Sequence, residues 1–99
     1  MPAMHRPTID IELTPKERAL ILRYGYPFDR IKQALMDVST SKRIENVSLD
    51  IFEVEQLIGD LCRSINHEEG GLRVQAQLDE LCCRIEYALR TGDGELEWF

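Results

Sequence analysis

In the second half of the chain, four side chains carry the sulfur and imidazole donors that a zinc ion prefers: Cys62, His67, Cys82 and Cys83. A zinc site needs its ligands within a few ångströms of one centre. If the chain folds back near residues 68–69, the first cysteine and the later pair lie about seven helical residues out of step, on the order of 10 Å. No Cys-x-x-Cys or His-x-x-x-His pair shortens this distance. The sequence therefore predicts no metal site, and it predicts that Cys62 and Cys82 are small apolar core residues.

The two histidines are the next candidates for chemistry, because histidine is the commonest general acid or base. His5 lies in a segment without periodic pattern, and His67 lies in an acidic turn between two predicted helices. Neither position places a nucleophile or a catalytic partner beside the ring. Gly70 and Gly71 precede a helix but lack the rest of a phosphate-binding loop. We expect no catalytic residue and no cofactor.

The element on which the others must pack is the run from Asp50 to Ile65. At 100° per residue its apolar side chains fall within one arc of about 140°, the stripe of a core-facing helix. That stripe consists of Ile51, Val54, Leu57, Ile58, Leu61, Cys62 and Ile65. Asp50 and Glu53 have the spacing of a capping box, which predicts that the helix begins directly after Asp50.

A similar signal starts an earlier helix. Thr14, Pro15 and Glu17 are a cap residue, a first-turn proline and the second half of a capping box. The helix is expected to run to about Tyr24. Gly25 follows it as the expected left-handed C-cap.

The remaining pattern predicts helices at about residues 28–38 and 72–90 and short strands at about residues 9–13 and 47–49. The short turn before the last helix makes the last two helices antiparallel neighbours. We therefore expect a mainly α fold, a small helical bundle of about four helices with a C-terminal antiparallel helix hairpin. The two extended stretches are suited to pair as a short two-stranded β ribbon.

Composition sets the broad class of the protein. Ninety-nine residues with 43% hydrophobic content are expected to form a single helical domain over residues 1–99, with residues 1–8 and 93–99 as flexible ends. No apolar run approaches the ~20 residues that span a bilayer, and the N-terminus lacks the apolar core of a signal peptide. Three cysteines are an odd number and do not make a disulfide framework. We expect a cytoplasmic protein without membrane contact.

The net charge of −6 is unevenly distributed. Residues 1–44 carry +3, whereas residues 45–69 carry −6. An acidic balance argues against nucleic acid as the partner, because neutralising phosphates needs a basic face. The asymmetry lets the first segment dock on the second, or it steers a basic partner to the acidic helix.

Several apolar residues fall outside the predicted core stripes and are candidates for contact with a partner. The last predicted helix has a second face outside its core stripe, and on the central helix Phe52 lies one heptad before the unusual mid-helix Gly59. Aromatic residues also cluster after the first helix, and two large aromatic side chains stand at the chain end. These candidates are Phe52, Gly59, Leu72, Ala76, Cys83, Tyr87, Trp98, Phe99, Tyr24 and Tyr26. Each group also has a structural explanation as core or scattered exposure.

Part of the first half resembles the helix-turn-helix of sigma-type and response-regulator transcription factors. The resemblance is carried by Leu13-Thr-Pro-Lys-Glu-Arg18, Arg23-Tyr-Gly25, Ile31, Ala34-Leu35 and Val38-Ser39. It implies DNA binding, with a recognition helix at residues 40–47. The sequence departs from the pattern at Lys32, Met36 and Asp37, and residues 40–47 show no clear apolar stripe.

Together these observations favour a non-catalytic protein–protein interaction module that self-associates. The expected partner is a second copy of the chain, as a dimer, or another protein. The alternatives are a degenerate helix-turn-helix transcriptional regulator and a small enzyme or metal-binding protein.

Overall fold

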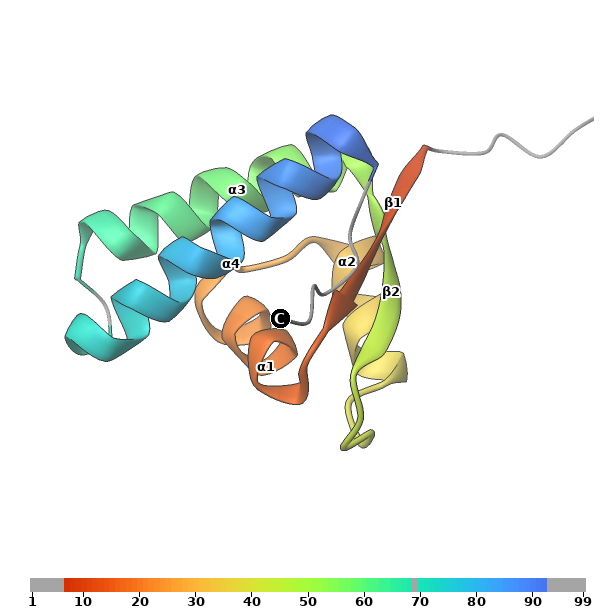
Figure 1. Ribbon diagram of the computed structural model, residues 1–99, viewed down its shortest axis with the longest axis horizontal. Coiled ribbons are helices and arrows are strands. Elements are labelled where there is room, and N and C mark those ends of the chain that lie inside the picture. Colours follow the sequence, from red (N-terminus) through yellow and green to blue (C-terminus); the bar gives the residue numbers. More distant parts are fainter. Residues whose placement is uncertain (1–6, 69, 93–99) are drawn as a thin grey trace, which may run out of the picture.

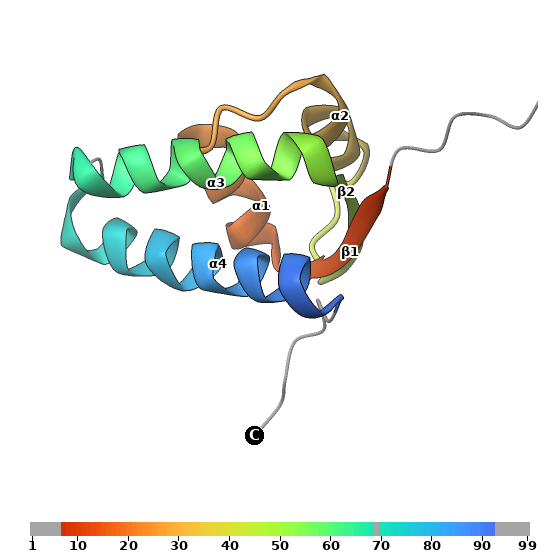
Figure 2. The same cartoon turned by 90° about the horizontal axis from the view of Figure 1, so that it is seen from above.

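A computed structural model describes residues 7–68 and 70–92 and confirms the mainly helical fold (Figure 1). In chain order the elements are β1 (Thr8–Leu13), α1 (Pro15–Tyr24), α2 (Asp29–Asp37), β2 (Glu45–Asp50), α3 (Ile51–Asn66) and α4 (Gly71–Thr91). Helices α3 and α4 lie side by side as an antiparallel hairpin, and the ribbon lies at one end of it (Figure 1 and Figure 2). Among the described residues, none of the helices has the combination of length and hydrophobicity that a membrane span requires.

The two strands form the expected ribbon. They pair antiparallel, with Ile9 opposite Leu49 and Ile11 opposite Val47, and these four side chains are buried. Because side chains alternate along a strand, the polar residues between them lie on the other face. The ribbon therefore presents one apolar face to the helices, which supply the core that a two-stranded sheet lacks alone.

Both strands lead directly into a capped helix, as the sequence predicts. The Thr14 hydroxyl accepts from the Glu17 amide at 3.1 Å, and the Thr14 amide donates to the Glu17 carboxylate at 2.9 Å. At the start of α3 the Asp50 carboxylate accepts from the Glu53 amide at 3.0 Å. The Glu53 carboxylate, which the sequence predicts to complete a capping box, accepts from the Ile31 amide of α2 at 3.0 Å. These bonds satisfy first-turn N–H groups that have no acceptor within the helix.

The expectation for Gly25 is wrong. Its φ of −95° is right-handed, and the following residue, Tyr26, takes the positive φ of 45°. Gly25 is buried against α3, where an added Cβ would lie 2.4 Å from Leu57 Cδ1. Glycine is needed here because the chain passes closely over α3, not because the helix ends in a left-handed turn.

The helix-turn-helix resemblance does not extend to the fold. Residues 40–44 form no helix, and residues 45–50 form strand β2, so the recognition helix that the resemblance implies is absent from this segment. Arg18, which is 3% exposed, donates to the carbonyl oxygens of Leu13, Ser41 and Arg43 at 2.8–2.9 Å. This buried guanidinium fixes the connection between α2 and β2 against the end of β1.

Candidate functional site

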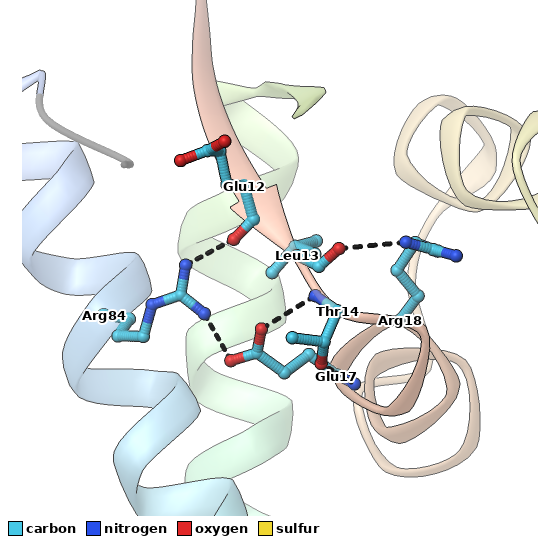
Figure 3. Close-up of polar contacts among 6 residues, drawn as sticks. All are labelled: Glu12, Leu13, Thr14, Glu17, Arg18 and Arg84. Atoms are coloured by element: carbon cyan, nitrogen blue, oxygen red, sulfur yellow. Dashed lines mark hydrogen bonds and ion pairs between the residues drawn. The ribbon is translucent and has the colours of Figure 1, made fainter. Parts of the chain in front are cut away.

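The rotation of α4 about its own axis decides which of its side chains face outward, and Arg84 helps to set that rotation. Its guanidinium donates to the Glu12 carbonyl of β1 and pairs with the Glu17 carboxylate of α1 (Figure 3). Glu17 is itself held by the capping box with Thr14. The side of α4 that carries Arg84 is therefore fixed to β1 and α1 by charge-assisted bonds.

The second face predicted for α4 is exposed, and we call it the outer stripe: Leu72, Ala76, Cys83 and Tyr87. Leu72 is 83% exposed and Tyr87 is 45% exposed. At 100° per residue the four positions share an arc of about 60°, and they extend over about 22 Å of helix. The stripe is a narrow apolar line, because Asp79 and Glu80 lie on its two sides.

The surface of α3 around Phe52 and Gly59 is also exposed. Phe52 is 61% exposed, and an added Cβ at Gly59 would meet no atom within 4 Å. Both residues face away from the core, in agreement with their place outside the apolar stripe of α3. Gly59 is therefore not required by any contact among the described residues.

The aromatic residues after α1 separate into two environments. Tyr24 is buried, its carbonyl accepts from Ser64 Oγ at 2.8 Å, and its hydroxyl would lie 2.7 Å from a Cβ added at Gly70. It closes the end of the core, so it does not fit the interface expected of it. Tyr26 and Phe28 are 58% and 55% exposed on the connection to α2.

The two aromatic residues near the chain end that were predicted to contact a partner, Trp98 and Phe99, lie outside the described residues. The outer stripe on α4, Phe52 with Gly59 on α3, and Tyr26 are thus the predicted candidates that the structure places on the surface.

The structure also brings together residues that the sequence analysis separates. The sulfurs of Cys62 and Cys82 and a carboxylate oxygen of Glu86 all lie within 4.8 Å of one another. The prediction that the two cysteines lie on the order of 10 Å apart is wrong. Helical side chains lean toward their own N-terminus. In this antiparallel hairpin Cys62 leans away from the connecting turn and Cys82 leans toward it, so the two sulfurs converge.

Cys82 is buried, with the Cys62 thiol and the Glu86 carboxylate beside it. The side chain is 3% exposed, and burial, reinforced by the neighbouring Cys62 thiol, raises the pKa of Cys82 from 9.0 to about 12. Cys83, the next residue, is exposed. Glu86 was not a sequence candidate, although its place four residues after Cys82 puts both on one side of α4 and could have indicated it.

Comparison with known proteins gives no further guide to this site. No family model, no curated protein and no solved structure matches the chain. The chemistry and geometry of the described residues therefore carry the functional argument.

Proposed function

We propose that this chain is a non-catalytic protein–protein interaction module that self-associates through the outer stripe of α4. The observation that carries the proposal is the exposure of Leu72 and Tyr87 at the two ends of the stripe, 83% and 45% respectively. A Leu side chain contributes about 1.5–3 kcal/mol when it is fully buried. Burying both ends of the stripe against another helix therefore offers a substantial gain.

The spacing of the stripe suits an antiparallel copy of itself. If two α4 helices cross a two-fold axis near residues 79–80, Leu72 meets Tyr87 of the second copy, and Ala76 meets Cys83 of the second copy. The small residues lie nearest the axis and allow close approach, while the large residues cover the ends. The positions repeat at an 11-residue interval, which keeps such a stripe nearly straight along a helix.

Charge opposes this pairing and makes it dependent on salt. Asp79 and Glu80 flank the stripe at its middle, so each acid would lie near the same acid of the second copy. Each chain also carries a net charge of −6. The association is accordingly weak at low ionic strength, and salt strengthens it by screening repulsion between exposed carboxylates.

The test is the solution mass, measured by light scattering after gel filtration under reducing conditions. We expect a mass that rises toward a dimer with protein concentration, and more so in about 0.5 M than in about 0.05 M salt. The double variant Leu72→Glu with Tyr87→Glu should remain a monomer, because it adds two charges to the stripe.

A matched control adds the same two charges elsewhere. Phe28 and Met36 are 55% and 49% exposed and lie away from α4, so Phe28→Glu with Met36→Glu should dimerise as the native chain does. A native monomer at every concentration and salt would overturn self-association. The stripe would then serve a different protein, and its acidic flanks would favour a basic amphipathic helix.

The location that we propose for this module is the cytoplasm. Cys62, Cys82 and Cys83 are all free thiols, although the first two sulfurs lie close together. Reducing compartments keep such thiols free, whereas oxidising ones favour disulfides.

A further inference from the structure

The three donor atoms between α3 and α4 lie close to the separations of a metal site. In a tetrahedral zinc site, Zn–S bonds of about 2.3 Å and Zn–O bonds of about 2.1 Å place the donors roughly 3.6–3.8 Å apart. The Cys62 and Cys82 sulfurs and the Glu86 oxygen already lie within 4.8 Å of one another. The remaining difference is about 1 Å, which is the scale of a rotation about one side-chain bond.

Two rigid elements present these donors. Cys82 and Glu86 are four residues apart on α4, the spacing by which two ligands on one helix face reach a common ion. Cys62 comes from α3, and fully buried Leu61, Leu81 and Ile85 pack in the core beside it. A site on packed helices holds its ligands more firmly than a site on loops.

The donor set is selective in its chemistry. Two thiols and one carboxylate suit a thiophilic divalent ion, whereas magnesium and calcium prefer oxygen ligands alone. Three protein ligands leave a fourth tetrahedral position open to water. Cys82 is 3% exposed, and in such a partly dry site the attraction between an ion and its anionic ligands is stronger than in water.

We infer that Cys62, Cys82 and Glu86 form a binding site for a thiophilic divalent cation of the zinc class. Binding breaks the two S–H bonds, forms two S–metal bonds and releases two protons to solvent, with no change in oxidation state. Because the thiols must lose their protons, affinity increases with pH. The ion links α3 to α4, which stabilises the hairpin in a way that does not involve the outer stripe.

The test is a titration of the full chain with Co²⁺, a spectroscopic probe for zinc, in a phosphine reductant that does not itself supply thiol ligands. We expect thiolate-to-cobalt charge-transfer absorption that saturates at one ion per chain and is displaced by Zn²⁺. Cys62→Ser and Cys82→Ser should each weaken binding by about 100-fold or more, and Glu86→Gln by about 10-fold.

Cys83→Ser is the matched control, since it removes a neighbouring thiol that is exposed and outside the cluster. It should bind within about twofold of the native chain. Far-ultraviolet circular dichroism of each metal-free variant checks folding. If Cys82→Ser does not fold, the Cys62→Ser variant decides the test, because Cys62 is only half-buried. A native chain without charge-transfer absorption, or equal loss in Cys83→Ser and Cys62→Ser, would overturn the inference. The Leu72→Glu with Tyr87→Glu variant should bind the ion normally, so this result is separate from self-association.

Discussion

The two sides of the α3–α4 hairpin use the same kinds of residue for different purposes. Cys82 is buried and Cys83, its neighbour in the chain, is exposed. Likewise Ile85 is 0% exposed, whereas Leu72 on the same helix is 83% exposed. Residue type alone does not separate these pairs. The difference arises from the rotation of α4 about its own axis, which turns one side of the helix to the core. Arg84 holds this rotation through its contacts with Glu12 of β1 and Glu17 of α1, and the outer stripe is then left in solvent.

The strongest contrast in stability is expected between two alanine substitutions on α4, one on its core side and one in the outer stripe. Ile85→Ala should destabilise the chain by about 2–5 kcal/mol, because it leaves a cavity in a packed core. Leu72→Ala removes a side chain with little to contact and should stay within about 0.5 kcal/mol. Urea unfolding at low protein concentration and low salt measures both without a contribution from association. Similar decreases in the free energy of unfolding for the two variants would contradict the difference in burial between the two sides of α4.

Two glycines offer a similar contrast around α3, since Gly25 packs against this helix from the end of α1 and Gly59 lies within it on the exposed side. An alanine Cβ at Gly25 would meet Leu57 Cδ1 at 2.4 Å and the Ile21 carbonyl at 2.8 Å, so Gly25→Ala should cost about 1–3 kcal/mol. Gly59 lies in the helix with open space beside it, so Gly59→Ala should stabilise by about 1 kcal/mol through helix propensity. Thermal unfolding should show shifts of opposite sign. A destabilising Gly59→Ala would indicate a requirement for glycine beyond the described contacts.

The smallest effect concerns thiol reactivity and its dependence on pH. In metal-free native protein, a thiol reagent at pH 8 should modify Cys83 on the order of tenfold faster than Cys82 or more, because Cys82 is buried and protonated. Single-cysteine variants followed by mass spectrometry assign the rates. Equal rates for Cys82 and Cys83 would contradict the burial difference.

The raised pKa of Cys82 also gives the direction of a stability change. The pKa of Cys82 is about 12 in the folded state against an ordinary 9.0. Between these two pH values the folded state therefore keeps a proton that the unfolded state releases. The resulting stabilisation is complete below about pH 9 and is lost as pH rises toward 12. The free energy of unfolding, measured from denaturant curves at pH 8 and about pH 10, should therefore decrease less between these two pH values in Cys82→Ala than in the native chain.

Local signals along the chain were enough to predict the elements and most of their limits. Capping residues at Thr14 and Asp50 marked two helix starts to the residue, and alternation in the two strands predicted the ribbon. The apolar periodicity of α4 also separated its core side from the outer stripe. These signals are local, since each depends on neighbours within a few residues along the chain.

Which residues those elements bring together could not be predicted from such local signals. Gly25 must be glycine because α3 packs closely against it, and Tyr24 is buried at the end of the core. In the hairpin, side chains on the two helices lean toward each other, which brings the Cys62 sulfur close to Cys82 and Glu86. Each depends on distances of a few ångströms between segments far apart in the chain. A helical period fixes the direction of a side chain around its axis, but not the offset between two packed helices, and that offset decides which side chains meet.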